Sequence, residues 1–528
     1  MPAQKSNLHK VILIIIALLV VIMGVVLICI PPALFPDPAN GFQVLRSMQM
    51  GSGFNVFASP DQSDISQNYT EFLTWWSPGQ YLVPYFFKLI SGINLGQATA
   101  VTITLANISG LAGFYFFFKR IGFSSLVAAL SLIFIICQLA FYVPDVYYNG
   151  GEILLFAFEG WFLYGCIALK KPDWKLVLFV LISVWIGFFF KSSFLWIYIA
   201  GLICLWISLC ANRAGIAEWI KKGIWIGIPA AVSLAAIYFL FMSKGQSPAT
   251  TSKGFKLAAE TFSFPLATPL LTSFSLDDIF HGLIYHFGKP TVDHQWAILI
   301  LVLLAVLSLL LIVSIILSTP NNNYKIMVAV FYFGALLFFG FAFLKQLNIS
   351  YEARHFRIIG LLIAPCIITL AIRLKPIYRT LFATACFTLL CFSLQYVIKG
   401  YVINKNVSAK GVTGISQPNI DQASLNAIMK LDRANKNAIF VFVNNDIGLE
   451  IGHNRIITLP PVGDDLKIDM DDYRYEGFAG PLYIILPESY NGPKEKMIMK
   501  SFPGYAGFNI SMLSDNYVLY SAYMERKK

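Results

Sequence analysis

The amino-acid sequence predicts a mainly α-helical membrane protein with about eleven spans of roughly 20 residues each, followed by a small α/β domain. Three observations lead to this fold class. The apolar residues come in long runs with few charges, such as residues 11–30 and 296–317. The composition is 57% hydrophobic and only 13% charged, with a mean hydropathy of +0.67. From residue 400 onward the long runs stop, and charged and turn-forming residues become frequent.

Each long apolar run has the length that a helix needs to cross the hydrocarbon layer. The stretch 176–210 is too long for one helix, and Lys191 interrupts it. Because a bare lysine at mid-membrane costs a few kcal/mol, we expect two short spans with a turn between them. The expected spans are residues 11–30, 97–118, 125–143, 153–169, two within 176–210, one ending near 241, 296–317, 326–344, 358–372 and 378–398.

The basic residues predict the orientation. Lys and Arg gather in short turns at residues 119–120, 170–175 and 373–379, and such turns lie on the cytoplasmic side. The N-terminus is then cytoplasmic, and the large loops 31–95 and 243–295 lie outside with the C-terminal domain. The net charge of +11 follows from the same bias, so we expect no nucleic-acid partner.

The domain division follows from the change in composition. We expect a multi-span membrane domain over residues 1–399 and an extracytoplasmic α/β domain over residues 400–528. Apolar patterning in the second domain predicts one helix and four strands. The helix covers residues 422–434, and the strands cover 438–443, 481–487, 507–513 and 516–523. With no glycine-rich nucleotide motif, this domain is interpreted as a cap or an acceptor-binding module.

Asp37 is the first candidate for chemistry, because it follows the first span closely and lies between two prolines. Prolines fix the backbone, so this carboxylate is held on a stiff turn. At the membrane interface it is suited to act as a general base for a hydroxyl group. The alternative interpretation is a structural one, in which Asp37 caps the helix that follows.

The stretch TWWSPGQYLVPYFFKL in the first loop is aromatic and amphipathic. Trp75 and Trp76 are typical of an interfacial belt. The run beginning at Tyr81 predicts a helix lying along the membrane surface. These three side chains are interpreted either as an anchor or as a platform for a sugar or prenyl chain.

A group of cations at the outer mouth of a later span is the other candidate. Arg354, His355 and Arg357 lie in YEARHFRIIG, and Lys191 lies on the same expected face. Outer cations run against the positive-inside bias, and arginine forks bind phosphate. The bland alternatives are a charged turn and a snorkelling lysine. Asp145 and Glu152, in the second outer loop, are candidates for a second acid.

Taken together, these features resemble the membrane-embedded GT-C glycosyltransferases. Members have many spans, an acid soon after the first span, a second-loop acid, basic residues in later outer loops and often a C-terminal domain. Asp37 matches the first acid, Asp145 the second, and Arg354 or Arg357 a binder of the donor phosphate. The resemblance implies a cell-envelope enzyme of the plasma (inner) membrane. It would transfer a hexose or pentose from a polyprenyl-phosphate donor to a lipid, glycan or protein acceptor.

The resemblance also implies an inverting mechanism on the outer face. Asp37 takes the proton of the acceptor hydroxyl, while Arg354, Arg357 and Lys191 stabilise the leaving lipid phosphate. Many members carry paired acids in the first loop, whereas Asp37 is followed by Pro38. The single acid gives no support to a divalent metal, and no cofactor is assigned.

Other classes of protein share part of this pattern. A transporter or flippase of lipid-linked glycans would place charges inside the membrane and show repeats between its halves, and the sequence shows no repeat. An O-antigen-type polymerase also uses outer-loop arginines but lacks a first-loop acid. A non-catalytic assembly subunit is a fourth alternative. Transfer from a labelled polyprenyl-phosphate sugar distinguishes the first class from the others.

Overall fold

The computed structural model describes residues 7–210, 215–245, 251–279, 292–463, 466 and 473–526. Its internal contacts divide the chain into two compact units. The membrane unit comprises Met1–Val25, Ile103–Asp145 and Gly151–Ile398. The composite unit comprises Val26–Thr102, Val146–Gly150 and Lys399–Lys528, so it combines the first loop with the C-terminal domain.

Among the described residues, eight helices are long and apolar enough to cross a bilayer, or nine if the bent pair α5 and α6 forms one span. Two shorter apolar helices, α8 and α9, lie on either side of Lys191. The eight long helices, the bent pair counted as one span, and the two shorter helices correspond one to one with the spans expected from the sequence. The helices lying wholly or partly in this unit are α1 (Leu8–Cys29), α4 (Leu95–Arg120), α5 (Ser125–Ile136), α6 (Leu139–Val146), α7 (Gly151–Ala168), α8 (Trp174–Phe190), α9 (Phe194–Cys210), α10 (Ile216–Leu240), η1 (Met242–Lys244), α11 (Glu260–Ser273), α12 (Leu276–Ile279), α13 (His294–Ser318), α14 (Asn322–Leu344), η3 (Ala353–Phe356), α15 (Arg357–Arg373) and α16 (Pro376–Asn406).

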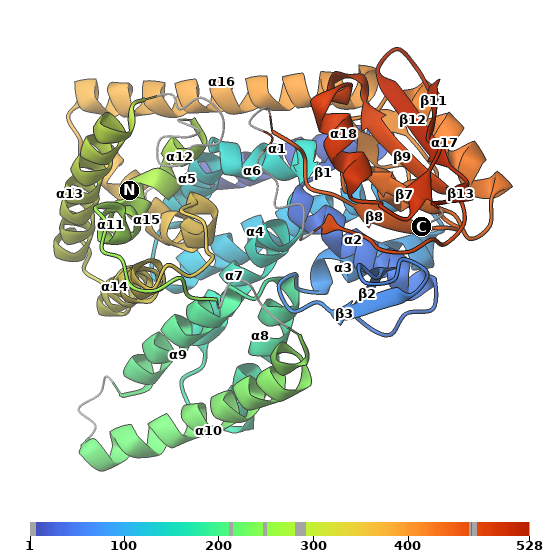
Figure 1. The fold of residues 1–528 in the computed structure, drawn as a ribbon. Helices are drawn as coiled ribbons and strands as arrows, with labels where there is room; N and C mark the ends of the chain where they lie inside the picture. Colours follow the sequence, from blue (N-terminus) through green and yellow to red (C-terminus); the bar gives the residue numbers. More distant parts are fainter. Residues whose placement is uncertain are drawn as a thin grey trace. The chain divides into compact units, whose positions relative to one another are not determined.

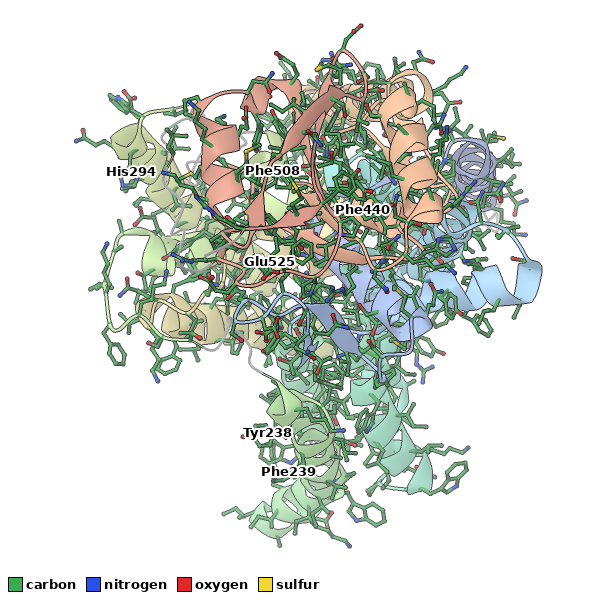
Figure 2. All side chains as sticks on the ribbon, turned by 45° about the vertical axis from the view of Figure 1, so that its right-hand side comes forward. Tyr238, Phe239, His294, Phe440, Phe508 and Glu525 are labelled. Atoms are coloured by element: carbon green, nitrogen blue, oxygen red, sulfur yellow. The ribbon has the colours of Figure 1, made fainter. Side chains whose placement is uncertain are left out.

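The surface of this unit is apolar where its helices have no protein neighbour. Helices α8, α9 and α10 pack against one another (Figure 1). On α10, Tyr238 and Phe239 are 54% and 68% exposed and extend away from the helix (Figure 2). Large exposed apolar surfaces are unfavourable in water and are typical of contact with lipid. The chain is a multi-pass membrane protein.

Part of the expected second loop, residues 243–295, forms a buried helix. Helix α11 packs against α13, α14 and α15. Its two prolines each remove a backbone donor. Pro269 cannot donate to the carbonyl of Pro265, which instead accepts a hydrogen bond of 2.7 Å from Thr268 Oγ1. The Thr268 side chain therefore supplies the donor that Pro269 lacks, and α11 continues through the core.

The composite unit is built around a five-stranded sheet in the order β11-β12-β9-β7-β8. Strand β7 is parallel to β8 and β9, while β9, β12 and β11 are antiparallel in turn. Its main elements are α2 (Pro36–Gln49), α3 (Gly79–Ser91), α17 (Gln422–Ala434), η4 (Ile447–Glu450), η6 (Glu488–Tyr490), α18 (Pro493–Lys500), β1 (Ala33–Leu34), β2 (Val56–Pro60), β3 (Asn68–Phe72), β4 (Tyr147–Tyr148), β5 (Ala409–Lys410), β6 (Ser416–Gln417), β7 (Ile439–Phe442), β8 (Arg455–Thr458), β9 (Leu482–Pro487), β10 (Tyr505–Ala506), β11 (Asn509–Met512), β12 (Tyr517–Ala522) and β13 (Met524–Glu525). The expected helix and four strands are all present; β8 is an additional strand of the five-stranded sheet, and the short strands β5, β6, β10 and β13 were not expected either.

Alternation along β7 creates a core on each face of the sheet. Phe440 packs with Leu425 of α17 on one face, and Ile439 packs with Ile498 of α18 on the other. Figure 2 shows Phe440 within the sheet of the C-terminal domain. Ile65, from the first loop, is fully buried in the second of these cores.

The first loop and the C-terminal domain therefore fold together. Ile65 N donates to Glu476 O at 2.8 Å, and Glu476 N donates to Gln62 O at 2.8 Å. A Cβ on Gly96 would lie 2.3 Å from Gly414 O, so only glycine at position 96 permits these two segments of the chain to approach so closely. The composition placed residues 31–95 with the membrane part, whereas the structure groups them with the C-terminal residues.

Candidate functional site

The membrane unit contains a cluster of buried charges where three helices begin or end. Lys191 adopts an extended conformation directly after α8, which breaks the span before α9. Glu152 lies in the first turn of α7. A Cβ on Gly151 would lie 2.8 Å from Phe190 O and 3.0 Å from Lys191 Cβ, so the start of α7 and the end of α8 lie in close contact.

Arg354 reaches this cluster from η3, just before α15. The segment is fixed by a hydrogen bond of 2.9 Å from Ala353 N to Asp277 Oδ2. Aromatic packing adds to this, because Tyr351 lies over Phe343 with ring centroids 4.1 Å apart. A short helix held in this way presents its arginine with little freedom.

A single carboxylate joins the two cations. Glu152 Oε1 accepts hydrogen bonds from Lys191 Nζ and from Arg354 Nη1, the latter at 3.3 Å. Arg354 also pairs with Glu352. The Glu152 and Lys191 side chains are only 9% and 19% exposed, so this charge network is largely shielded from solvent. Charged pairs in such surroundings are costly to desolvate and depend on their partners.

The remaining predicted cations lie in the same segment with different contacts. The Arg357 guanidinium lies 5.3 Å from the ring centroid of Phe156, as a cation–π pair. His355 stacks on Phe339 at 6.1 Å and lies 3.4 Å from Ser350 Oγ. The histidine is therefore part of the aromatic packing that supports η3.

The sequence predicted Glu152 only as a candidate second carboxylate in the outer loop, and it assigned no role to Glu159. With Phe156 they are spaced at i, i+4 and i+7, which places all three on one face of α7. Glu159 is 4% exposed, so that face carries two buried carboxylates. An acid repeating on one face of an apolar helix was the signal available in the sequence.

Asp145 lies at the end of the bent α5 and α6 pair, whose axes differ by 52°. It is 7% exposed, and among the described residues neither of its carboxylate oxygens has a hydrogen-bond partner. Tyr142 OH and Gln138 Nε2 are also buried without a partner there. Unpaired buried polar groups cost free energy, and they often occur at functional sites.

Asp37 lies in the first turn of α2, within the composite unit. Phe35 occupies the N-cap position, and no side chain forms a capping hydrogen bond there. Asp37 is thus inside the helix rather than at its cap, and its charge is favourable next to the positive end of the helix dipole. Just before it, β1 pairs with β4, and Phe35 N donates to Tyr148 O at 3.1 Å.

The aromatic residues of the first loop divide into two groups. Trp75 and Trp76 stack with ring centroids 5.1 Å apart, and Trp75 is 38% exposed. Tyr81 is completely buried, and its hydroxyl donates to Asn55 Oδ1 at 2.7 Å. The expected helix is present as α3, but a buried Tyr81 supports the loop from within.

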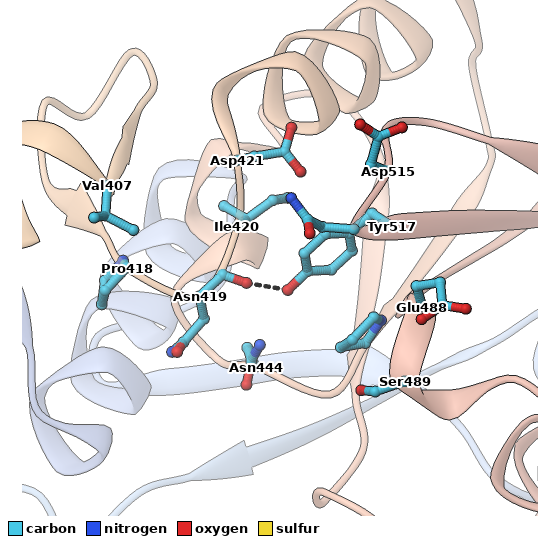
Figure 3. Close-up of a pocket in the computed structure, with 12 residues that line it drawn as sticks. Val407, Pro418, Asn419, Ile420, Asp421, Asn444, Glu488, Ser489, Asp515 and Tyr517 are labelled. Atoms are coloured by element: carbon cyan, nitrogen blue, oxygen red, sulfur yellow. Dashed lines mark hydrogen bonds between the residues drawn. The ribbon is translucent and has the colours of Figure 1, made fainter.

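The C-terminal domain has a pocket of about 460 Å³ at the carboxyl ends of β7 and β9 (Figure 3). Ligands of α/β sheets commonly bind at such strand ends. Asp421 and Tyr517 line it, and the Tyr517 hydroxyl donates to Asn419 O. Asp421 accepts hydrogen bonds from Ser424 and Ser514. With Glu488 also present, the acidic lining does not suit a phosphate group.

Within the described part of the chain, no group of three or more His, Cys, Asp or Glu side chains is arranged to hold a metal ion. The eight cysteines are free thiols in the structure, and most are buried.

The fold of this chain is similar to that of a solved glycosyltransferase, AftD, in line with the resemblance noted in the sequence. The arabinofuranosyltransferase AftD from mycobacteria matches 98% of this chain with a TM-score of 0.50 and 9% identity. This chain spans 41% of the length of AftD. ArnT from Cupriavidus metallidurans, bound to undecaprenyl phosphate, matches with a TM-score of 0.45, 12% identity and 98% of each chain.

The oligosaccharyltransferase AglB from Archaeoglobus fulgidus, in complex with an inhibitory peptide and a dolichol-phosphate, matches with a TM-score of 0.46 and 12% identity. The match covers 96% of this chain and 73% of AglB. No protein-family model matches the sequence, and no curated protein matches it.

Proposed function

We propose that this protein is an inverting glycosyltransferase that uses a polyprenyl-phosphate sugar as donor. The observation that carries the proposal is the pair of cations, Lys191 and Arg354, held on the buried Glu152 inside a fold shared with AftD. A lipid phosphate is an anion that must be bound near lipid, and such a pair is suited to receive it.

Arg354 and Lys191 are the proposed binders of the donor phosphate, with Arg357 as a further cation. As the bond from the anomeric carbon to the phosphate oxygen breaks, negative charge develops on the leaving lipid phosphate. Fixed cations stabilise that charge because they need no reorganisation during the reaction. An incoming phosphate would compete with Glu152 for its two partners, so Glu152 keeps the site ordered before the donor binds.

Asp37 is the proposed general base. The acceptor hydroxyl loses its proton to the Asp37 carboxylate as its oxygen attacks the anomeric carbon from the side opposite the phosphate. Configuration at that carbon inverts. The support for this assignment is the position of Asp37 in the first turn of α2, shortly after the first span ends at Cys29.

The proposed orientation places the reaction on the outer face of the plasma (inner) membrane. Its basis is the distribution of basic residues, with Lys119, Arg120 and Arg373 in turns assigned to the cytoplasm. The N-terminus is then cytoplasmic and the composite unit is extracytoplasmic. The acceptor is a lipid, glycan or protein on that side.

The experiment is transfer by purified protein from a radiolabelled polyprenyl-phosphate pentose or hexose, with membrane lipids supplying acceptors. Native protein should release polyprenyl phosphate and label an acceptor. Asp37→Asn should lower transfer by about 10²–10⁴-fold, the range expected for loss of a general base. Membrane insertion should be unchanged, and the thermal unfolding temperature should fall by a few degrees at most, because the variant loses the favourable interaction of the charge with the dipole of α2.

Two results would contradict this proposal. Near-native transfer by Asp37→Asn would remove Asp37 from the mechanism. Movement of the intact labelled lipid across a vesicle membrane, without transfer, would favour a flippase instead.

A further inference from the structure

The helix that carries Asp37 is held by the C-terminal domain through buried polar contacts. Asn40, Gln43 and Arg46 are spaced at i, i+3 and i+6 along α2, and each meets the turn region around η4 and β8. All of these residues belong to the composite unit. They connect parts of the chain about 400 residues apart.

Arg46 makes the most extensive of these contacts. Its Nε donates to Ile451 O at 2.6 Å, and its Nη2 donates to Asn454 O. Arg46 is only 9% exposed. Burial lowers the pKa of the guanidinium to about 10, while the nearby Asp432 carboxylate opposes that shift, so the charge is kept at neutral pH. Charge-assisted bonds to carbonyls are strong, and breaking them leaves buried acceptors unpaired.

The receiving turn is itself fixed by one carboxylate. Asp432 accepts from Gly452 N at 2.9 Å and from Asn454 Nδ2 at 2.8 Å. It also pairs with His453 Nδ1 at 2.9 Å. The two carbonyls that bind Arg46 are thus presented by an ordered turn.

Gln43 and Asn40 extend the contact toward the start of α2. Gln43 Nε2 donates to Asn445 O at 2.6 Å and to Thr458 Oγ1 at 3.2 Å. Asn445 Nδ2 donates to Asn40 Oδ1 at 2.6 Å. At about 3.6 residues per turn, Arg46 lies on roughly the opposite side of α2 from Asp37. Arg46 therefore holds α2 on the side away from Asp37, and the Asp37 side chain itself is only partly buried.

We infer that Arg46 is a positioning residue, through which the C-terminal domain sets the position of α2 and hence of Asp37. The inference rests on the proposed function, in which Asp37 is the base. It assigns the C-terminal domain a direct part in the reaction step. A base displaced by about 1 Å loses much of its effect. Loss of the Arg46 contacts should therefore lower kcat.

The test uses the full-length protein with Arg46→Met, which keeps an unbranched side chain as far as the Nε position and removes the guanidinium donors. Hydrogen exchange of peptides from α2 should become about tenfold faster. The kcat for transfer should fall about tenfold or more, while the KM for the donor stays within about twofold. Arg46→Lys, which keeps the charge but not the fork, should give an intermediate kcat.

Arg474→Gln is the matched control, because Arg474 is exposed and pairs only with the exposed Glu476 in the described structure. It should leave exchange and transfer unchanged. If Arg46→Met does not fold, Asn40→Ala, which removes one peripheral bond, takes its place and should give a smaller change of the same kind.

The outcomes are separable. Native exchange rates in α2 of the Arg46→Met protein would show that Arg46 does not hold α2 in place, whatever the activity. Faster exchange with native kcat would overturn the positioning role. If native protein transferred no sugar from polyprenyl-phosphate donors, the proposed function would fail, and the positioning role would fall with it. The exchange rates would still decide whether the domain grips α2.

Discussion

Two arginines in this protein, Arg46 and Arg354, are held by opposite kinds of partner. Arg46 donates to the main-chain carbonyls of Ile451 and Asn454 in a folded domain. Arg354 pairs with two carboxylates, and one of these, Glu152, also binds Lys191. The contacts of Arg46 have a structural role, because breaking them would leave buried carbonyl groups unpaired. Those of Arg354 are exchangeable, because a phosphate can replace a carboxylate with similar geometry.

The partner of a buried cation therefore says more about its role than its burial does. The sequence does not distinguish the roles of the two arginines, since both lie near helix ends and close to apolar residues. In our proposals, Arg354 binds the donor and Arg46 positions the base.

The largest expected difference is in donor binding. Arg354→Gln should lower kcat/KM for the polyprenyl-phosphate donor by about 10²–10³-fold, since it removes a preorganised charge from the leaving group. Arg46→Gln should change the donor KM by no more than about twofold. The measurement is initial transfer rate over a range of donor concentrations. Equal increases in KM for the two variants would remove the distinction.

The next prediction concerns the carboxylate that the two cations share. Glu152→Gln should lower the free energy of unfolding by about 3–5 kcal/mol, because it leaves Lys191 and Arg354 without their common charged partner in a buried site. Inorganic pyrophosphate should then raise the unfolding temperature of the variant more than that of the native protein.

Thermal unfolding in detergent, with and without pyrophosphate, gives both quantities. Glu352→Gln is the matched control, because Glu352 is more exposed and contacts Arg354 alone of the two cations in the described structure. A Glu152→Gln protein of native stability that gains nothing from pyrophosphate would show that the cluster is a fixed structural network.

The smallest effect concerns an acid near the Arg46 contacts. Burial raises the pKa of Asp446 to about 6. Between about pH 4 and 6 the unfolded chain loses this proton before the folded chain does, so stability falls as pH rises, by about 2–3 kcal/mol in total. Asp446→Asn should remove that fall and raise the unfolding temperature at pH 7 by a few degrees.

Thermal unfolding of the native and Asp446→Asn proteins from pH 4 to 7 checks this. The difference between the two curves isolates Asp446 from the other titrating groups. A difference that does not change with pH would mean that Asp446 is ionised without cost, and that the domain next to α2 tolerates buried charge.

Local patterning was enough to predict most of the elements. The expected spans correspond to α1, α4, α5 with α6, α7 to α10 and α13 to α16, and the break at Lys191 is present between α8 and α9. In the C-terminal domain the expected helix coincides with α17. These elements follow from apolar periodicity and run length, which are local properties.

The candidate site was predicted only in part. Lys191 and Arg354 were expected to share a phosphate, and the structure brings them onto one carboxylate. Glu152 was expected only as a candidate second acid, and its pairing with both cations was not predicted, although it repeats with Glu159 on one face of α7. Tyr81 was interpreted as an anchor or as a platform for a sugar or prenyl chain, yet it is buried and its hydroxyl donates to Asn55. Whether an aromatic side chain of an amphipathic helix faces lipid or protein depends on neighbours that sequence spacing does not identify.

The sequence by itself determined that the chain is a multi-span membrane protein with an α/β domain, because the length of an apolar run and its periodicity fix how a segment can meet lipid or water. Only the tertiary structure decided which charges are partners. Gln43 and Asn445 are 402 positions apart, and Glu152 and Arg354 are 202 apart. No local pattern encodes such pairs, since they form only when distant helices and strands pack and close the long loops between them.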